Sequence, residues 1–315
     1  MREQKSQFRA EDIQDLTGYV VIVTGGNSGI GYETALNLAL HNARVYIASR
    51  SAERISSAIH QMKESAPNKN LDLRILQLDM MDLASVKAAA TRFVSEETRL
   101  DILINNAGIM GTPFETTKDG YESQWQVNYL APFVLTHNLL PLMLRTASET
   151  PDKTRVRVIN LATEMTAMLG PKTISLKDVD LKDACGPTAA LQRYSHSKQG
   201  SIRHAKELND RYSAQGLTAY SLHPGLIKTN LQGKDPSLFG RVQGLVTKVI
   251  PKVSAHEGAL NSLYCATSPK VVQEGAGRYF IPVGKLQPRV GGWLADKDGN
   301  AELWKWSENV DQQIR

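Results

Sequence analysis

Cysteine is scarce in this sequence, with only Cys185 and Cys265 among 315 residues. Neither has a second cysteine at short spacing, so the sequence indicates neither a disulfide framework nor a zinc site or other metal site. Scarce, isolated thiols are typical of a reducing compartment. We therefore expect an intracellular protein without a bound metal.

Long apolar runs and blocks of like charge are also missing. No apolar run is long enough to span a bilayer, and Met1–Asp15 is polar and charged, without the apolar centre of a signal peptide. The net charge of +5 comes from lysines and arginines scattered among acids, and no basic run is interleaved with aromatic residues. These absences argue against a nucleic-acid partner and an integral membrane segment, and they favour a cytoplasmic location.

Short β-branched runs alternate with helical stretches along the chain, a pattern typical of a parallel sheet covered on both faces. We predict an α/β fold of the Rossmann-like, doubly wound kind, in which a parallel sheet of about seven strands carries helices on both faces. The length favours a single domain over residues 1–315. The predicted strands are Tyr19–Thr24, Ala43–Ala48, Asp72–Leu78, Asp101–Asn105, Arg155–Leu161, Thr218–His223 and Arg278–Ile281. The predicted helices are Gly29–Leu40, Ala52–Ser65, Leu83–Glu97, Tyr121–Leu144, Leu191–Ala214 and Ala255–Ala266.

Four segments fall outside this alternation. An N-terminal arm covers residues 1–16, and residues 164–190 and 225–253 leave strands at their carboxyl ends, where ligands of such sheets bind, so we expect them to wall a substrate pocket. Residues 298–315 carry Leu303, Trp306, Val310 and Ile314 at helical spacing. This C-terminal helix packs on its own domain, caps the pocket or forms a subunit contact, and the sequence leaves all three open.

A glycine-rich turn, Thr24–Gly31, follows the first predicted strand and opens the first predicted helix. Gly25, Gly29 and Gly31 have the spacing GxxxGxG. Such a turn lets a pyrophosphate approach the N–H groups at a helix N-terminus, where side chains would block it. An ordinary strand-to-helix turn is the alternative, but the strand before it and the helix after it favour dinucleotide binding.

The end of the second predicted strand reads Ala48-Ser49-Arg50. An acidic residue there would accept hydrogen bonds from a ribose 2′-hydroxyl, whereas an arginine suits a 2′-phosphate. We therefore favour NADP(H) over NAD(H) as cofactor. The alternative is that Arg50 merely points to solvent at a helix start.

Tyr194 and Lys198 are four residues apart in a predicted helix, so the phenol and the ammonium share a face. The positive charge is expected to lower the pKa of the phenol and make Tyr194 a proton donor and acceptor near neutral pH. His196 is turned away from that face, and we expect it to be non-catalytic. His223 is expected to shape the turn before Pro224. Glu164 is either a solvated loop carboxylate, which we favour, or an extra acid in the pocket.

Five motifs in order resemble the short-chain dehydrogenase/reductase superfamily. They are the turn Thr24–Gly31, Asn105-Asn106-Ala107-Gly108, Trp125-Gln126-Val127-Asn128, the pair Tyr194 and Lys198, and His223-Pro224-Gly225. The resemblance covers about Leu16–Ala266. It is strongest to the retinol-dehydrogenase-like and WW-domain-oxidoreductase-like branch, which includes many fungal enzymes, since Val127-Asn128-Tyr129-Leu130 and the long gap before Tyr194 recur there.

The resemblance implies roles for individual residues. Tyr194 would be the general acid/base, Lys198 would bind the nicotinamide ribose and lower the pKa of the phenol, and Asn128 would hold a water that joins Lys198 to solvent. Asp79 would contact adenine. The implied cofactor contacts are Gly25, Asn27, Ser28, Gly29, Ile30, Gly31, Arg50, Asp79, Met80, Asn106, Ala107, Gly108, Tyr194, Lys198, Pro224, Gly225, Ile227 and Thr229. The helix over Tyr121–Leu144 would be a candidate homodimer seam.

One position departs from the family pattern. Two serines usually end the fifth strand, and the second orients the substrate carbonyl, but here the run is Asn160-Leu161-Ala162-Thr163. The Thr163 hydroxyl can donate the same hydrogen bond. The sequence thus predicts hydride transfer between NADP(H) and a ketone, aldehyde or alcohol of a fairly apolar small molecule. The alternative is a dinucleotide-binding protein whose redox activity is lost or redirected.

Overall fold

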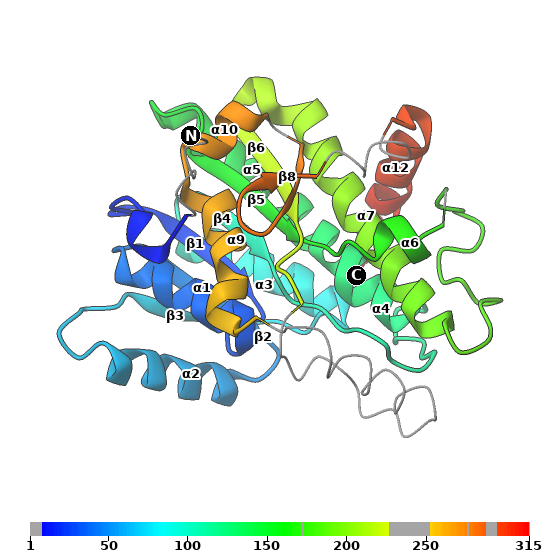
Figure 1. Cartoon of the computed structure of the whole chain (residues 1–315), viewed down its shortest axis with the longest axis horizontal. Helices are drawn as coiled ribbons and strands as arrows, with labels where there is room; N and C mark the ends of the chain where they lie inside the picture. Colours follow the sequence, from blue (N-terminus) through cyan, green and yellow to red (C-terminus); the bar gives the residue numbers. More distant parts are fainter. Residues whose placement is uncertain (1–7, 172, 227–252, 276, 288–294, 315) are drawn as a thin grey trace, which may run out of the picture.

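A central eight-stranded sheet organises the molecule, with strand order β3-β2-β1-β4-β5-β6-β7-β8 (Figure 1). The computed structural model describes residues 8–171, 173–226, 253–275, 277–287 and 295–314. Neighbouring strands from β3 to β7 pair in parallel, and β8 pairs with β7 antiparallel. The strands are β1 (Val20–Thr24), β2 (Arg44–Ser49), β3 (Leu73–Gln77), β4 (Ile102–Asn105), β5 (Val156–Leu161), β6 (Leu217–Leu222), β7 (Tyr279–Ile281) and β8 (Lys285–Leu286).

Helices cover both faces of the sheet, which confirms the predicted doubly wound fold. One face packs on α1 (Gly29–Leu40), α2 (Ala52–Ser65) and α9 (Ala255–Thr267), and the other on α3 (Leu83–Glu96), α5 (Ala131–Glu149) and α7 (Ala189–Tyr212). Strands β1, β2 and β4–β6 are buried on both faces, which explains their continuous apolar runs. The short elements are 3-10 turns at Ala10–Asp12 and Ser213–Gln215, α6 (Thr166–Leu169) and α10 (Lys270–Glu274).

The observed elements differ from the predicted ones in three places. Strand β8 was not predicted, because two residues carry no periodicity that a sequence pattern can detect. The predicted helix Tyr121–Leu144 starts later and is interrupted: α4 (Ser123–Trp125) leads into a π-helical turn at Gln126–Leu130 and then into α5. The C-terminal helix α12 covers Lys297–Gln313 rather than residues 298–315.

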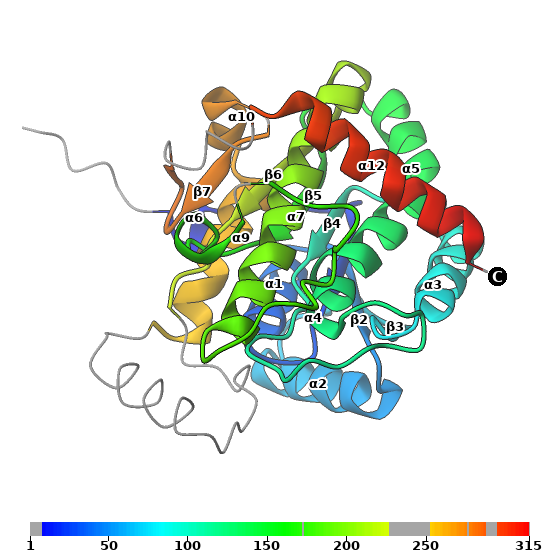
Figure 2. The same cartoon turned by 90° about the vertical axis from the view of Figure 1, so that its right-hand side faces the viewer.

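Helix α12 lies across α5 and α7 (Figure 2). Leu303, Trp304 and Val310 are buried in the core that these helices share, so packing on its own chain is the observed role of this segment. A homodimer through the helical stretch Ser123–Glu149 stays a prediction, and α12 covers part of that surface.

The helical stretch Ser123–Glu149 is long and apolar enough to cross a membrane by length and composition alone. In its most apolar 18-residue window, 78% of the residues are buried inside the protein, as expected for the core helix of a globular domain. It is the one such stretch within the described residues.

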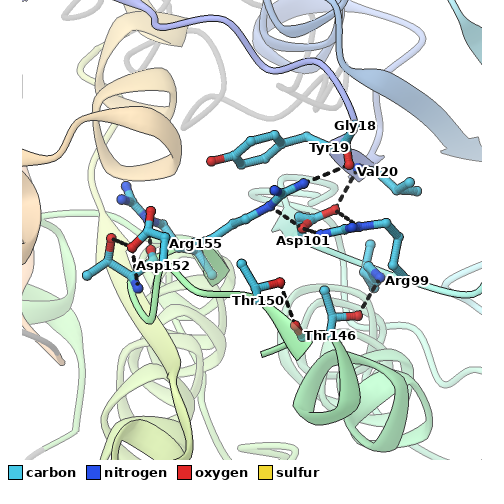
Figure 3. Close-up of polar contacts among 12 residues, drawn as sticks. Gly18, Tyr19, Val20, Arg99, Asp101, Thr146, Thr150, Asp152 and Arg155 are labelled. Atoms are coloured by element: carbon cyan, nitrogen blue, oxygen red, sulfur yellow. Dashed lines mark hydrogen bonds and ion pairs between the residues drawn. The ribbon is translucent and has the colours of Figure 1, made fainter. Parts of the chain in front are cut away.

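A buried carboxylate connects neighbouring strands at the edge of the sheet where the parallel strands begin. Asp101, just before β4, accepts hydrogen bonds from Arg155 (2.6 Å), from Arg99 (2.7 and 3.0 Å) and from the backbone N–H of Val20 (2.8 Å) (Figure 3). Because parallel strands start at the same edge, these contacts tie β1, β4 and β5 together at the end opposite the glycine-rich turn.

Candidate active site

The glycine-rich turn forms a tight cradle between β1 and α1. A Cβ atom on Gly31 would lie 2.3 Å from the Gly25 carbonyl oxygen, and Gly25 has φ +66°, a left-handed conformation that favours glycine. The Thr24 hydroxyl accepts hydrogen bonds from the backbone N–H groups of Asn106 and Ala107, each at 3.0 Å. This contact brings the predicted Asn106–Gly108 segment against the turn.

The residues of this cradle fit a dinucleotide pyrophosphate. Ser28 is the N-cap of α1, and its side chain makes no capping bond to the helix. The first N–H groups of α1 therefore keep their capacity to bind an anion, and Gly29 and Gly31 leave room for its approach. Asn27, Ser28 and Gly29 are accessible, whereas Ile30 is buried and packs the turn onto the core.

Arg50 lies at the carboxyl end of β2, beside an open cleft of about 420 Å³ that also includes Gln77 and Asp79. Its side chain is exposed, and its carbonyl accepts a hydrogen bond from the Gln77 side chain at 3.1 Å. Asp79 turns the chain into α3, accepting the Met81 N–H at 2.9 Å, and Met80 beside it is buried. Arg92, from α3, lines the same cleft and was not predicted.

Asn128 lies in the π-helical turn, which aims its side chain at the Asn106–Gly108 segment. Its amide exchanges two hydrogen bonds of 2.9 Å with the backbone of Ile109 and donates a third to Ser197. A Cβ atom on Gly108 would lie 2.9 Å from Asn128 Oδ1 and 3.3 Å from Lys198 Nζ. Only glycine therefore allows these side chains to approach so closely, and three of the predicted site residues meet at one point.

Tyr194 and Lys198 share the buried face of α7, as predicted. Lys198 Nζ donates a hydrogen bond of 2.8 Å to the Leu161 carbonyl at the end of β5, and burial lowers its pKa to about 8. Burial also raises the pKa of the Tyr194 phenol above its ordinary value. The predicted lowering of that pKa is therefore wrong for this structure, because the loss of water around the phenol dominates and the ammonium is directed at a backbone carbonyl.

Thr163 follows β5 and is buried close to the Lys198 contact. Its hydroxyl accepts the N–H of Met165 at 3.3 Å, and its carbonyl accepts the hydroxyl of Thr166 at 2.9 Å. The hydroxyl proton of Thr163 is not used in either contact, so this hydroxyl keeps the capacity to donate one hydrogen bond.

Sequence comparisons show which proteins this chain is similar to. Residues 19–174 match the family model for short chain dehydrogenases. A short-chain dehydrogenase/reductase of Aspergillus calidoustus, drtF, is 37% identical over 304 residues, with 94% of each chain covered. Retinol dehydrogenase 12 of Mus musculus is 36% identical, covering 95% of this chain and 87% of the relative. The chain belongs to the short-chain dehydrogenase/reductase family. Within it, these relatives place the chain near retinol dehydrogenases and fungal enzymes.

Solved structures show the same fold for this dehydrogenase/reductase. A protein from Mycobacterium paratuberculosis has a TM-score of 0.71 at 30% identity, covering 98% of both chains. NADPH-bound carbonyl reductase from chicken fatty liver has a TM-score of 0.59 at 25% identity, covering 86% of this chain and 99% of the other.

In this family member, the structure also defines the surroundings of three further polar residues. His196 is buried, stacks on Trp125 with ring centroids 4.5 Å apart, and contacts the Val179 carbonyl at 3.0 Å. Burial lowers its pKa to about 4, so it is neutral at pH 7. The His223 carbonyl accepts the side-chain amide of Asn261 at 2.8 Å, which fixes the chain before Pro224. Glu164 is 47% exposed, consistent with a loop carboxylate.

Glu122, a buried acid that the sequence did not single out, contacts both Asp180 and Arg193, the residue before Tyr194. Glu122 caps α4 by accepting the Trp125 N–H at 2.8 Å, and its own N–H donates to Asp180 at 2.8 Å. Arg193, next to Tyr194, lies 3.8 Å from the Glu122 carboxylate. Burial raises the pKa of Glu122, while the Trp125 N–H and Arg193 oppose that effect. No apolar periodicity marks this cluster, so the pattern of the sequence could not predict it.

The far side of the site is described only in part. Gly225 has φ +97° and packs near Val253 and Pro282 beyond the end of β6, and Pro224 precedes it. Ile227 and Thr229, predicted as cofactor contacts, lie outside the described residues, as does most of the predicted wall 225–253. Within the described part of the chain, no group of three His, Cys, Asp or Glu side chains is placed to hold a metal ion.

Proposed function

We propose that this protein is an NADP(H)-dependent oxidoreductase that transfers a hydride between nicotinamide and a ketone, aldehyde or alcohol of a fairly apolar small molecule. The observation that carries the proposal is the convergence of Gly108, Asn128 and Lys198, with Tyr194 one helical turn from Lys198. When bound, the nicotinamide supplies or accepts the hydride.

The protein's own groups supply proton transfer and orientation. A phenol with a raised pKa is protonated at neutral pH, so Tyr194 suits the reductive direction, in which it gives its proton to the developing alkoxide. Thr163 would donate a second hydrogen bond to the same oxygen. With a pKa of about 8, Lys198 is mostly cationic at pH 7 and would hold a ribose hydroxyl and favour the phenolate left after proton transfer.

The preference for NADP(H) rests on Arg50. Its guanidinium is exposed beside the cleft at the end of β2, and Ser49-Arg50 offers no carboxylate to a 2′-hydroxyl. A guanidinium binds phosphate through paired hydrogen bonds. The NADPH that the carbonyl reductase neighbour binds supports the same choice. The free thiols at Cys185 and Cys265 fit our further proposal of a cytoplasmic location.

A panel of apolar ketones, aldehydes and alcohols, followed by the absorbance of reduced nicotinamide, tests this function. We expect NADPH-dependent turnover in native protein, a loss of about 10²-fold or more in Tyr194→Phe, and a reversal of cofactor preference toward NADH in Arg50→Glu. His196→Gln, altered on the other side of the same helix, serves as the control and should retain activity. NADPH binding without turnover across the panel would instead favour a dinucleotide-binding protein with lost or redirected activity. The observation that suggests this alternative is the Ala162-Thr163 pair, which stands where the family usually has two serines.

A further inference from the structure

Buried polar groups gather under α7, where the carboxyl end of β6 lies beside the start of β7. Ser221 pairs with Tyr279 across the two strands. Their neighbours Tyr220 and Phe280 belong to the core on the α9 side, and side chains alternate along a strand, so Ser221 and Tyr279 face α7. Both hydroxyls, together with His223 Nδ1, are buried without a hydrogen-bond partner among the described residues.

Such a group of unpaired atoms is unusual in a folded protein. Buried polar atoms are almost always hydrogen-bonded, and where protein partners are missing, an ordered water commonly takes their place. A water needs two to four polar partners in a space that can hold it, and two neighbouring hydroxyls and an imidazole nitrogen meet the first condition. Ala162, which packs in one cluster with Tyr279 and stands where the family usually has serine, offers these atoms no hydroxyl as a partner.

Tyr279 packs against Ala162, the residue that precedes Thr163. Its ring packs in one buried cluster with Ala162 and Ile202. Ile202 follows Tyr194 by eight residues and Lys198 by four, so all three share one face of α7. Burial raises the pKa of the Tyr279 phenol, and a negative charge on Glu164 or on Tyr194 would raise it further.

His223 lies close to Glu164, whose side chain is partly exposed to solvent. The Glu164 carboxylate lies 3.9 Å from His223 Nε2 and accepts the Gln287 side-chain amide at 3.0 Å. Burial lowers the pKa of His223, an effect that Glu164 and the Ala162 carbonyl oppose. A neutral imidazole has one donor and one acceptor nitrogen, so it can pass a proton from one side to the other without gaining charge overall.

We propose that ordered water held by Ser221, His223 and Tyr279 joins the Tyr194 phenol to Glu164 and gives it a second proton path to solvent, separate from Lys198 and Asn128. This inference rests on the proposed role of Tyr194. Each carbonyl reduced takes one proton from the Tyr194 hydroxyl. The phenolate then regains one proton from the water, and the water, the Tyr279 hydroxyl, His223 and Glu164 each give up one proton and receive one. Over the cycle Tyr194 is restored, the substrate gains one proton and the solvent loses one.

Tyr279→Phe tests the path because it removes the hydroxyl and keeps the ring against Ala162 and Ile202. With the fastest carbonyl compound of the panel above, we expect the single-turnover rate to fall about threefold to tenfold, less than for loss of the general acid itself, and the solvent deuterium isotope effect to change. Tyr220→Phe is the matched control, since Tyr220 is buried in the same sheet but faces α9. Glu164→Gln should slow turnover in dilute buffer, and added imidazole should restore it.

A crystal structure at about 1.5 Å resolution supplies a readout independent of activity. We expect a water within hydrogen-bond distance of the Ser221 and Tyr279 hydroxyls, and its displacement or loss in Tyr279→Phe. An empty site in that structure, or equal rates and isotope effects in Tyr279→Phe and Tyr220→Phe, would overturn the path. If Tyr194→Phe is inactive and Tyr279→Phe is normal, only the path is wrong, whereas an active Tyr194→Phe overturns the proposed function itself.

Discussion

Thr163 shows how one substitution in a family pattern can be tested. Its buried hydroxyl accepts the Met165 N–H and keeps its own proton for a substrate oxygen. Thr163→Val keeps the shape and removes that donor, so we expect turnover to fall by about 10²–10³, as for deletion of one donor to a developing oxyanion.

Thr163→Ser is the matched control for this experiment. It keeps the hydroxyl and removes only the methyl group, so its kcat should stay close to that of native protein. Comparable turnover in the valine and serine variants, measured by NADPH absorbance, would show that Thr163 does not hold the substrate oxygen.

His204 makes the stability of the protein sensitive to acid. The ring is buried against Phe133 and Trp304, its Nδ1 lies 3.2 Å from the Asn160 side-chain amide, and burial lowers its pKa to about 3. In the unfolded chain a histidine titrates near pH 6.5. Between these values the unfolded state binds more protons, so the free energy of unfolding decreases as pH falls from about 6.5 toward 3.

Removing that titration should flatten the pH dependence of stability. We expect His204→Gln to lower the slope of unfolding free energy against pH by about 1.4 kcal/mol per pH unit between pH 6 and 4, as measured by urea unfolding. His60 has a side chain that is 74% exposed, and His60→Gln should leave the slope unchanged. An unaltered slope in His204→Gln would mean that the ring is protonated when buried.

At the scale of elements, a buried carboxylate links α12 to α5 and α3. Asp311 accepts hydrogen bonds from His137 at 2.7 Å and Asn138 at 2.9 Å, both on α5, and Lys87 on α3 donates to its carbonyl at 3.0 Å. Asp311→Ala should cost about 1–3 kcal/mol in unfolding free energy, because buried donors lose their acceptor. Glu302→Ala, at an exposed position of the same helix, should cost little. Equal unfolding midpoints for the two variants in guanidinium would contradict this role.

Periodicity predicted where the helices and strands lie, but not every local distortion. The β-branched runs before the glycine turn and before Asn105 are strands buried on both faces, and their composition alone indicates this. The π-helical turn at Gln126–Leu130 is different, because its residues are buried all round and so show no apolar stripe from which an extra residue could be detected. The turn matters, since it directs Asn128 at Ile109.

At the scale of the whole molecule, the glycine-rich turn was more predictable than the contacts around Tyr194. A phosphate cradle needs glycine at fixed spacing for steric reasons. Gly31 shows this requirement, because it lies so close to Gly25 that no side chain fits between them. The pKa of Tyr194 was predicted with the wrong sign, because spacing reveals the neighbouring charge but not the depth of burial. The Glu122–Asp180 contact joins residues 58 positions apart, and no local pattern encodes such a pairing.

The two ends of the sheet should separate stability from activity. Asp101 is fully buried at the edge opposite the glycine turn, where Arg99, Arg155 and the Val20 N–H converge on its carboxylate (Figure 3). Asp101→Ala would leave two arginines and one buried N–H without their acceptor, and we expect a loss of about 3 kcal/mol in unfolding free energy. The folded fraction should keep a normal kcat, since none of these groups borders Tyr194 or the cradle.

Asp152→Ala is the control, because Asp152 is exposed in the loop before β5 and, among the described residues, its carboxylate accepts hydrogen bonds only from Thr154, two residues further on. Its unfolding free energy should change by less than about 1 kcal/mol. Urea unfolding and kcat measured on the same samples decide the matter. If Asp101→Ala lowered kcat while its unfolding midpoint stayed normal, the carboxylate would be coupled to the site through β4, whose other end carries Asn105 and leads to Gly108, rather than fastening the sheet alone.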